Sequence, residues 1–389
     1  MSQNKILYLS YDGILEPLGY SQVFKYVEKL SKDFDISIVS FEKSANVKDT
    51  KNYEKVRGLI QKKGIKWIKH KYHHKPQVPS TIYDLIVLTK TMLIQRLFFG
   101  ANIIHLRGYP LGIPLVFLNW LFNYKVIFDI RGFWVDEKVD RDGWSKSSIK
   151  YKFLKFIEKR LFKMSDKIVT LTEMSKKIIQ NVHDVDDKKI SVIRTCADKI
   201  KPSKTKRDEK INFGYLGSTG RAYNFRQTLL FFKKLKKSKE VGKIFIFTGD
   251  DHQKVQKEVI ECGLQPDHYQ ISFVKSEEIS DAFEKFDCLI FNLKINFSIS
   301  ASMPTKIGES LSSNTPVICN NFNDDIEEIS NFCNACKVVD FQTSNFEEIN
   351  DFLLNDSSNE RCQNTYEKYF TLDSGCLLYT SPSPRDDEL

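Results

Sequence analysis

Short apolar strands alternate with helical stretches along most of this chain, and the alternation starts twice. The first series begins with a strand expected at Lys5–Ser10, and the second begins at Ile211–Leu216. Strands that are separated by helices pair in parallel through right-handed crossovers, so each series predicts a doubly wound α/β domain. A polar, proline-containing run at 199–210 lies between them and is typical of a linker. The sequence therefore predicts two domains, at 1–198 and 211–374, joined by that run.

The length of 389 residues exceeds what one hydrophobic core usually serves, which agrees with two domains. In the first domain we expect further strands and helices, the strands at 35–40, 103–106, 125–129 and 167–171 and the helices at 21–32, 82–98, 110–122 and 147–164. In the second domain we expect a helix at 226–237 and strands at 243–248, 269–273, 288–291 and 316–319.

The formal net charge of +9 suits anionic small molecules, a phosphate-bearing lipid surface or nucleic acid. No basic arm, zinc-finger spacing or aromatic RNA-binding signature is present, so nucleic acid ranks last. The eight cysteines are scattered, as expected of free thiols in a reducing cytosol. Cys333 and Cys336 form a C-x-x-C pair without a second pair or a nearby histidine, and we interpret it as chance spacing. His73 and His74 lie in a basic connection, so we expect no metal site.

The segment 302–320, S-M-P-T-K-I-G-E-S-L-S-S-N-T-P-V-I-C-N, holds the most informative charges. Lys306 and Glu309 lie three residues apart at the start of a short helical run, so both can point into one cleft. A helix N-terminus offers free N–H groups and partial positive charge to a phosphate, and a carboxylate can accept both hydroxyls of a ribose. This combination suits a nucleotide diphosphate sugar. The alternative is an ordinary amphipathic helix that leads into a buried strand.

In each domain, one glycine-containing loop follows the first strand. Doubly wound sheets bind ligands at this position. Gly19 lets the backbone approach a ligand before a helix begins, or it belongs to a plain turn with Ser21 as the helix N-cap. The second loop, G-S-T-G-R, contains Gly217, Ser218 and Arg221. Arg221 could clamp a diphosphate through two hydrogen bonds, or it could be a solvated side chain on a structural turn. Neither a P-loop nor the dinucleotide G-x-G-x-x-G pattern is present, which argues against a dehydrogenase.

Charged residues also follow a buried strand at 125–129. Asp129 and Arg131 lie two apart beside a glycine, hence on one side if the strand continues, and a ligand explains such charges better than packing does. Arg107, after the preceding strand, could add a cation. The helix expected at 149–163 mixes lysines with apolar residues, which is compatible with an anionic membrane surface. Packing of that helix against its own sheet is the commoner explanation.

These loops, in this order, resemble the retaining GT-B glycosyltransferases, especially family 4, the glycosyl transferases group 1. The matching pieces cover the chain from about residue 5 to about 372 and are Y-D-G-I-L-E-P-L-G-Y-S-Q (11–22), F-D-I-R-G-F-W-V-D-E (128–137), G-Y-L-G-S (214–218), P-T-K-I-G-E-S-L (304–311) and P-V-I (316–318). The resemblance implies a GT-B fold, two Rossmann-like domains facing a central cleft. The first domain would bind the acceptor, and the second would bind a nucleotide sugar, often a UDP- or GDP-sugar.

The resemblance also implies roles for single residues. Glu309 matches the glutamate that binds the ribose of the donor, within a motif that includes Pro304 and Thr305. Arg221 and Lys306 fall where basic residues would neutralise the diphosphate. The remaining donor contacts implied are Gly19 and Gly217–Ser218 near the phosphates and Val274–Lys275 near the base. No metal and no cofactor besides the donor substrate are implied, because these cations would stabilise the leaving group.

One position departs from the family. Many members carry a glutamate eight positions before the ribose-binding one, and here that position is Ala301. The sequence thus predicts a cytoplasmic glycosyltransferase of surface polysaccharide synthesis that acts on a glycan or lipid-linked acceptor, with peripheral membrane contact left open. The alternatives are a GT-B-like UDP-N-acetylglucosamine epimerase and an inactive partner subunit.

The segment at 376–386 has no helical or strand period. It looks like a translated sequencing adapter joined to a truncated reading frame. We expect the natural chain to continue differently after about Gly375, and we treat 375–389 as a non-native tail.

Overall fold

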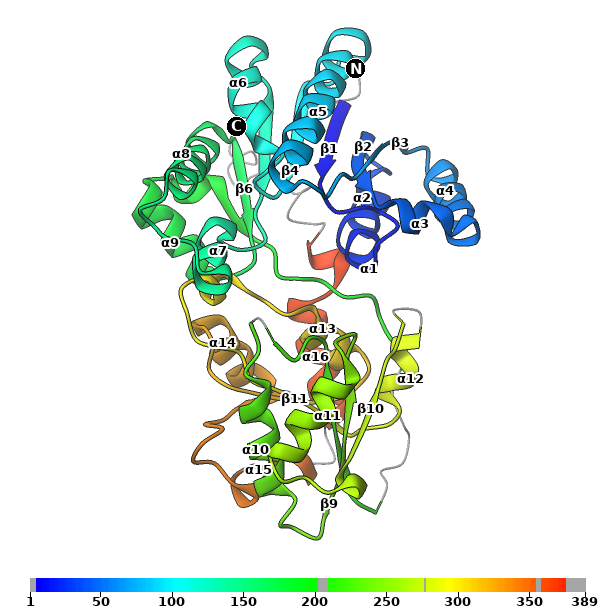
Figure 1. The fold of residues 1–389 in the computed structure, drawn as a ribbon, viewed down its shortest axis with the longest axis vertical. Coiled ribbons are helices and arrows are strands. Elements are labelled where there is room, and N and C mark those ends of the chain that lie inside the picture. The colour runs from blue at the N-terminus through cyan, green and yellow to red at the C-terminus, as the bar shows by residue number, and fades with distance from the viewer. Residues whose placement is uncertain (1–4, 202–208, 221, 276–277, 355–357, 376–389) are drawn as a thin grey trace, which may run out of the picture. The chain divides into compact units, whose positions relative to one another are not determined.

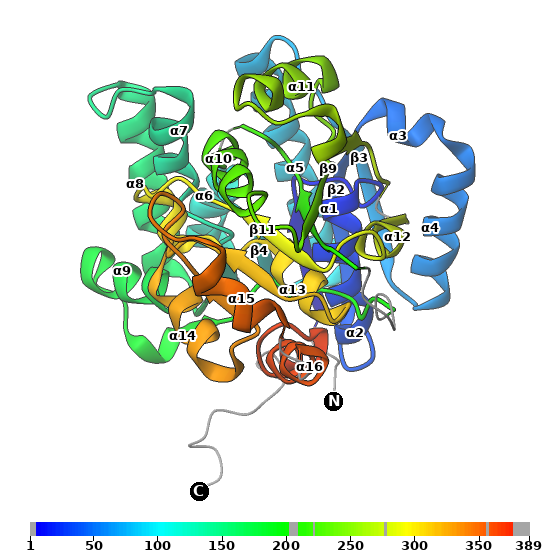
Figure 2. The same ribbon diagram turned by 90° about the horizontal axis from the view of Figure 1, so that it is seen from below.

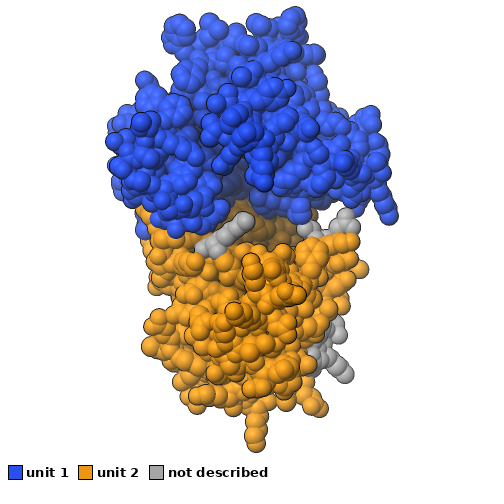
Figure 3. All heavy atoms as spheres, viewed as in Figure 1, with its two compact units in different colours: residues 1–193, 376–389 blue, residues 194–375 orange. Residues whose placement is uncertain are grey.

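A computed structural model of the protein describes residues 5–201, 209–220, 222–275, 278–354 and 358–375. The chain forms two compact units, up to Ile193 and from Arg194 to Gly375, which Figure 3 colours separately. Each unit holds one parallel sheet between helices (Figure 1). Both predicted doubly wound domains are therefore present.

The first unit contains a seven-stranded sheet in the order β3-β2-β1-β4-β5-β6-β7. Its strands are β1 (Lys5–Ser10), β2 (Asp35–Glu42), β3 (Lys66–Lys71), β4 (Ile103–Arg107), β5 (Lys125–Asp129), β6 (Lys167–Thr170) and β7 (Ile190–Val192). Its helices are α1 (Pro17–Gly19), the π-helical η1 (Tyr20–Phe24), α2 (Lys25–Leu30), α3 (Ser44–Lys48), α4 (Thr50–Lys62), α5 (Gln77–Phe99), α6 (Gly112–Phe122), α7 (Trp134–Asp142), α8 (Ile149–Met164), α9 (Glu173–His183) and the short η2 (Asp187–Lys189).

The second unit contains a six-stranded sheet in the order β10-β9-β8-β11-β12-β13. Its strands are β8 (Ile211–Leu216), β9 (Val241–Phe247), β10 (Tyr269–Ser272), β11 (Cys288–Phe291), β12 (Val317–Cys319) and β13 (Cys336–Val338). Its helices are α10 (Phe225–Leu235), α11 (His252–Glu261), η3 (Pro266–His268), α12 (Ile279–Phe283), η5 (Ser298–Ala301), α13 (Thr305–Ser312), α14 (Asp324–Cys333), α15 (Phe346–Leu354) and α16 (Ser358–Tyr369), seen from below in Figure 2.

In both sheets the strand order reverses at the first strand of the unit. β1 pairs with β2 on one side and β4 on the other, and β8 pairs with β9 and β11 in the same way. Chain crossovers leave the sheet in opposite directions at such a point, which opens a crevice beyond the carboxyl ends of the strands. The loops after β1 and β8 are therefore positioned for ligand binding within their own units.

Four elements, β3, β7, β13 and η1, differ from the sequence-based expectation. The basic stretch interpreted as a connection overlaps the edge strand β3, whose three lysines hid its pairing with β2. β7 and β13 are only three residues long and were not predicted. Ser21 lies inside η1 and does not cap a helix, since the helical segment already begins at Pro17.

The second unit begins before the expected linker, because residues just after Ile193 pack on it. Thr195 Oγ1 donates to the carbonyl of Met303 at 2.7 Å, and the hydroxyl of Tyr366 donates to the carbonyl of Ala197 at 2.9 Å. Most of the expected linker, and the tail beyond Gly375, lie outside the described residues.

Candidate functional site

The loop after β8 is held by a carboxylate from the end of the next strand. Gly217 has a φ of +113°, which favours glycine, and its N–H donates to the carbonyl of Phe247 at 2.9 Å. One oxygen of Asp250, Oδ2, accepts hydrogen bonds from Ser218 Oγ at 3.0 Å and from Thr219 N and Oγ1 at 2.6 and 2.9 Å. The loop is thus a fixed turn at the carboxyl end of β8, and sequence reasoning missed Asp250.

Lys306 lies in the first turn of α13 and reaches back to the end of β8. Its buried Nζ donates to the carbonyl of Leu216 and lies 3.9 Å from the ring centre of Tyr223 and 4.8 Å from that of Phe291. Burial lowers the pKa of Lys306 to about 7, against the opposing charge of Glu309. The predicted cation is therefore at the carboxyl end of β8, where aromatic faces stabilise its charged form.

Gly217 also leaves space for this lysine. A Cβ atom built at Gly217 would lie 3.4 Å from Lys306 Nζ, which is the limit of ordinary contact. The glycine therefore serves both the positive φ of the turn and the approach of the lysine.

Glu309 lies one turn further along α13 and is partly buried. Burial raises the pKa of Glu309 to about 7, which Lys306 partly offsets. Among the described residues, no side-chain hydrogen bond or ion pair of its carboxylate is present. A carboxylate in this position can accept hydrogen bonds from a ligand's hydroxyl groups.

The N-terminus of α13 is positioned by two side chains that sequence reasoning missed. Pro304 occupies the N-cap, so no side chain caps the first N–H groups of the helix, which begins at Thr305. Asn323 Nδ2 donates to the carbonyl of Ser302 at 2.9 Å, and the hydroxyl of Thr195 holds the next carbonyl. The N–H of Ile307 donates to the carbonyl of Pro304 at 3.1 Å, so the N–H groups of Thr305 and Lys306 are the ones available to an anion in this turn.

The other positions singled out in the second unit are Val274, Lys275, Ala301 and Arg221. Val274 and Lys275 follow β10, and their loop is closed by a 2.9 Å hydrogen bond from Glu278 N to the carbonyl of Lys275. Ala301 is fully buried at the end of η5, which leaves no polar side chain there. Arg221 lies outside the described residues, so its role stays a prediction.

The first unit gathers a buried charge cluster at the carboxyl ends of β4 and β5. Asp129 is fully buried, and its Oδ2 lies 2.9 Å from Arg131 Nη2, 3.3 Å from Arg107 Nη1 and 3.7 Å from His105 Nε2. Burial alone would raise the pKa of Asp129, but Arg131, His105 and Arg107 together hold it well below its usual range. Asp129 is therefore a permanent carboxylate that orients two guanidinium groups. The strand ends at Asp129, and the ion pair places Arg131 beside it; the ligand inferred from the spacing of these two residues stays a prediction.

Sequence reasoning did not name His105 as a member of this cluster. Its ring stacks on Tyr8 with centroids 4.2 Å apart, and burial lowers the pKa of His105. The strand register places Arg107 beside Asp129, and His105 precedes it by two residues on the same strand face. That alternation was the signal that could have found it.

Gly19 is explained by packing within the first unit. A Cβ atom at Gly19 would lie 1.9 Å from the carbonyl oxygen of Gly13, so only glycine fits. The same loop is fixed by Glu42, whose carboxylate accepts N–H groups of Ile14 and Leu15 at 2.7 and 3.2 Å. Glu42 was not predicted.

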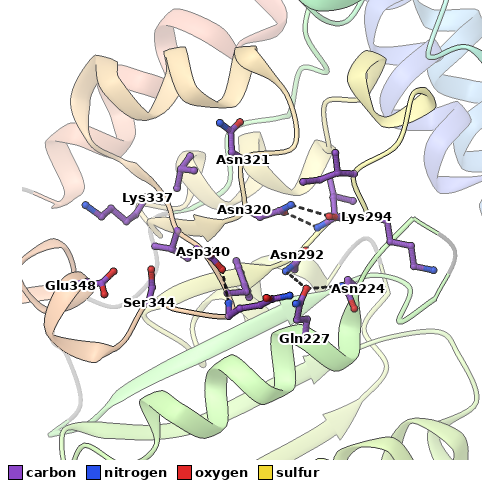
Figure 4. Close-up of a pocket in the computed structure, with 16 residues that line it drawn as sticks. Asn224, Gln227, Asn292, Lys294, Asn320, Asn321, Lys337, Asp340, Ser344 and Glu348 are labelled. Atoms are coloured by element: carbon purple, nitrogen blue, oxygen red, sulfur yellow. Dashed lines mark hydrogen bonds between the residues drawn. The ribbon is translucent and has the colours of Figure 1, made fainter.

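A cavity of about 870 Å³ lies in the second unit and is lined mainly by residues that follow β8, β11, β12 and β13 (Figure 4). The loops after β8 and β11 meet next to it through an antiparallel bridge between Tyr223 and Leu293. Its amide side chains bond to one another and to the backbone, with Gln227 Oε1 2.7 Å from Asn224 Nδ2 and Asn320 Oδ1 2.8 Å from Leu293 N. No residue named from the sequence as a site residue lines it.

The second unit is similar in sequence to a known family. Residues 197–369 match the family model described as glycosyl transferases group 1. No curated protein matches the chain in sequence.

Solved structures match both units together. Sucrose-phosphate synthase from Thermosynechococcus elongatus is 10% identical, with a TM-score of 0.71 and 97% of each chain covered. Alr3699/HepE from Anabaena, solved with UDP, is 9% identical with a TM-score of 0.67, covering 96% of this chain and 98% of that one. A putative UDP-N-acetylglucosamine 2-epimerase from Listeria monocytogenes is 10% identical with a TM-score of 0.60, covering 100% and 98%. The chain therefore has the GT-B fold, and its second unit resembles the glycosyl transferases group 1 along nearly its whole length.

Proposed function

We propose that this protein is a glycosyltransferase that moves a sugar from a nucleotide diphosphate sugar to a hydroxyl group of an acceptor. The observation that carries the proposal is the pair at the start of α13. Glu309 offers a carboxylate with no side-chain partner among the described residues, and Lys306 brings a cation to the carboxyl end of β8. The family match of the second unit supports the same assignment.

The donor would lie across the loop after β8 and the first turn of α13. Glu309 would accept the ribose hydroxyls, and the uncapped N–H groups after Pro304 would meet the diphosphate. Gly217 and Ser218 would allow the phosphates close to the backbone, with Val274 and Lys275 near the base. UDP or GDP is the proposed nucleotide, and the solved complex of Alr3699/HepE with UDP supports this class.

The role proposed for Lys306 follows from the negative charge that develops on the leaving group during the reaction. The bond between the anomeric carbon and the phosphate oxygen breaks, and the departing nucleoside diphosphate gains negative charge. Lys306 and Arg221 would stabilise that charge more in the transition state than in the ground state. A new bond forms between the anomeric carbon and the acceptor oxygen. We propose attack from the same face, with retention, and transfer of the acceptor proton to the departing phosphate.

The charge cluster of the first unit would orient the acceptor. Asp129 is ionised and fully buried, so it is suited to holding Arg131 and Arg107 and not to exchanging a proton. Arg131 retains some exposure, with 18% of its side chain accessible, and would contact the acceptor. We propose a glycan or lipid-linked acceptor in the synthesis of a surface polysaccharide, with no metal or further cofactor.

The test is a panel of UDP- and GDP-sugars, with and without glycan acceptors, in which binding, transfer and sugar interconversion are all measured. Transfer to an acceptor supports the proposal. Interconversion of the donor sugar without an acceptor would establish the epimerase alternative, whose fold is shared. Tight nucleotide-sugar binding without either reaction would establish an inactive partner subunit.

A further inference from the structure

Three neighbouring helices of the first unit expose a run of large apolar side chains. α6 packs against both α5 and α8, and Figure 1 shows α5 and α6 side by side. We name the exposed surface of the first two helices the α5–α6 apolar face. It is represented by Ile82 (53% exposed), Ile86 (61%), Leu97 (64%), Phe98 (78%), Trp120 (91%) and Leu121 (64%). Soluble monomers rarely leave so many large apolar side chains together in water.

The face is continuous along α5 and across to α6. Ile82 and Ile86 are four residues apart, so they lie on one side of α5. At the other end of α5, Arg96 Nη2 donates to the carbonyl of Phe122 at 3.1 Å, which joins the C-terminal ends of the two helices. Leu97 and Phe98 follow directly after that arginine. Packing within the unit does not account for these side chains, because each is more than half exposed.

The charges on these helices have one sign wherever they are exposed. The only carboxylates on α5, α6 and α8 are Asp84 and Glu158, and both are fully buried. Asp84 accepts a hydrogen bond from the hydroxyl of Tyr11 at 3.1 Å, and Glu158 pairs with Lys155. The exposed charged residues of the three helices are Lys90, Lys150, Lys152, Lys159, Arg160 and Lys163. Lys90 lies on α5, and the other five lie on α8, the neighbour of α6. The exposed charges of the three helices are therefore all positive.

We propose that the α5–α6 apolar face docks the first unit on the surface of a bilayer that contains anionic phospholipids. The apolar side chains would enter the boundary between headgroups and acyl chains, and the flanking lysines would contact lipid phosphates. Exposed tryptophan is typical of that boundary. No helix among the described residues is long and apolar enough to cross a bilayer, so the face lies on the membrane surface.

A second copy of the chain is a less suitable occupant of this surface. Two such faces would bring lysines of both copies together, and like charges oppose that contact. An anionic bilayer offers acyl chains to the apolar side chains and phosphates to the lysines. The sequence had suggested membrane contact through 149–163 alone, whereas the structure adds two helices with more exposed apolar area.

The experiment is sedimentation of the full chain with phosphatidylcholine vesicles, either pure or doped with phosphatidylglycerol, in the absence of any sugar nucleotide. We expect binding to the doped vesicles that weakens as salt is raised. The double variant Phe98→Ser, Trp120→Ser should bind at least ten-fold more weakly. The matched control is Val182→Ser, Ile260→Ser, whose parent side chains are 65% and 55% exposed outside this surface. That control should bind like the wild type.

Trp120→Phe separates insertion from a loss of folding. It should keep vesicle binding but lose much of the blue shift in tryptophan fluorescence that the wild type shows on binding. Equal thermal unfolding of all variants shows that the fold is intact. Absence of wild-type binding to anionic vesicles would overturn the proposal. So would a lipid-free dimer that the double variant abolishes, or a double variant that binds as well as its control. Because no donor is present, these outcomes are independent of sugar transfer.

Discussion

Lys306 and Glu309 lie one helical turn apart at the start of α13, and burial brings the pKa of each side chain to about 7. Desolvation disfavours both charges, while each charge favours the other. Near neutral pH the pair is therefore close to the point where either partner can lose its charge. A bound nucleotide diphosphate would favour the charged form of the lysine, and ribose hydroxyls would favour the carboxylate.

This coupling predicts a bell-shaped pH profile of kcat/KM with its maximum near 7. As pH falls below that value, Glu309 gains a proton and ceases to be a pure acceptor. As pH rises above it, Lys306 loses its proton and can no longer offset the charge of the leaving group. Initial rates measured against pH provide the test. Glu309→Gln should flatten the acidic limb and Lys306→Met the alkaline limb, and a flat wild-type profile would contradict both assignments.

Glu309→Gln should also weaken nucleotide binding. Loss of charge-assisted hydrogen bonds to the ribose should raise the Kd for UDP or GDP by about ten- to a hundred-fold. Isothermal titration measures the change, and Glu360→Gln on the exposed side of α16 is the matched control. An unchanged Kd would remove Glu309 from the donor site, even if transfer still occurs.

Lys306→Ala should affect turnover more than affinity. The charge on the diphosphate grows as the glycosidic bond breaks, so removal of the cation should lower kcat by roughly a hundred- to a thousand-fold while Kd changes less than about ten-fold. Single-turnover rates and equilibrium binding distinguish the two effects. Lys254→Ala, an exposed lysine on α11, provides the comparison. Equal losses in kcat and affinity would show that the lysine acts only in binding.

Asp129→Asn should destabilise the first unit. Two arginines would lose a buried counter-charge, a change that costs about 3–5 kcal/mol in comparable cases. The pKa of Asp129 lies far below its unfolded value of 3.8, so its contribution is complete above that value and is lost as pH falls through the folded pKa. The difference in the free energy of unfolding between the wild type and Asp129→Asn should therefore persist at mildly acidic pH and shrink only in strong acid.

The measurement is denaturant unfolding followed by tryptophan fluorescence, which reports on the first unit because it contains all four tryptophans, Trp67, Trp120, Trp134 and Trp144. Asp142→Asn, whose parent is partly exposed and paired with Lys138 at 2.8 Å, should change stability by well under 1 kcal/mol. A destabilisation of the Asp129 variant no larger than that of its control would show that the arginines find other partners.

Much of the fold could be predicted because buried parallel strands are continuous apolar runs. β1, β5, β8 and β11 have the predicted bounds, and each is largely buried. β3 was missed because an edge strand with three lysines in six residues lacks that pattern. The site was predictable in part because Lys306 and Glu309 are local in sequence. The roles of Asp250 and Thr195 could not be predicted, since each side chain bonds to a segment more than thirty residues away in the sequence. Only the folded unit brings such pairs together.

Asp250 offers the last test, because it fixes the donor loop without belonging to the predicted site. One oxygen of its carboxylate accepts three hydrogen bonds from Ser218 and Thr219, so Asp250→Ala should release the loop. We expect the KM for the donor to rise about ten-fold or more, because the loop must then be ordered on binding. Asp250→Asn keeps one acceptor oxygen, so its KM for the donor should lie between those of the wild type and the alanine variant. Steady-state kinetics with varied donor concentration measure the KM of both variants. If the alanine variant lowers only kcat, Asp250 takes part in the reaction itself, and the loop does not depend on it for donor binding.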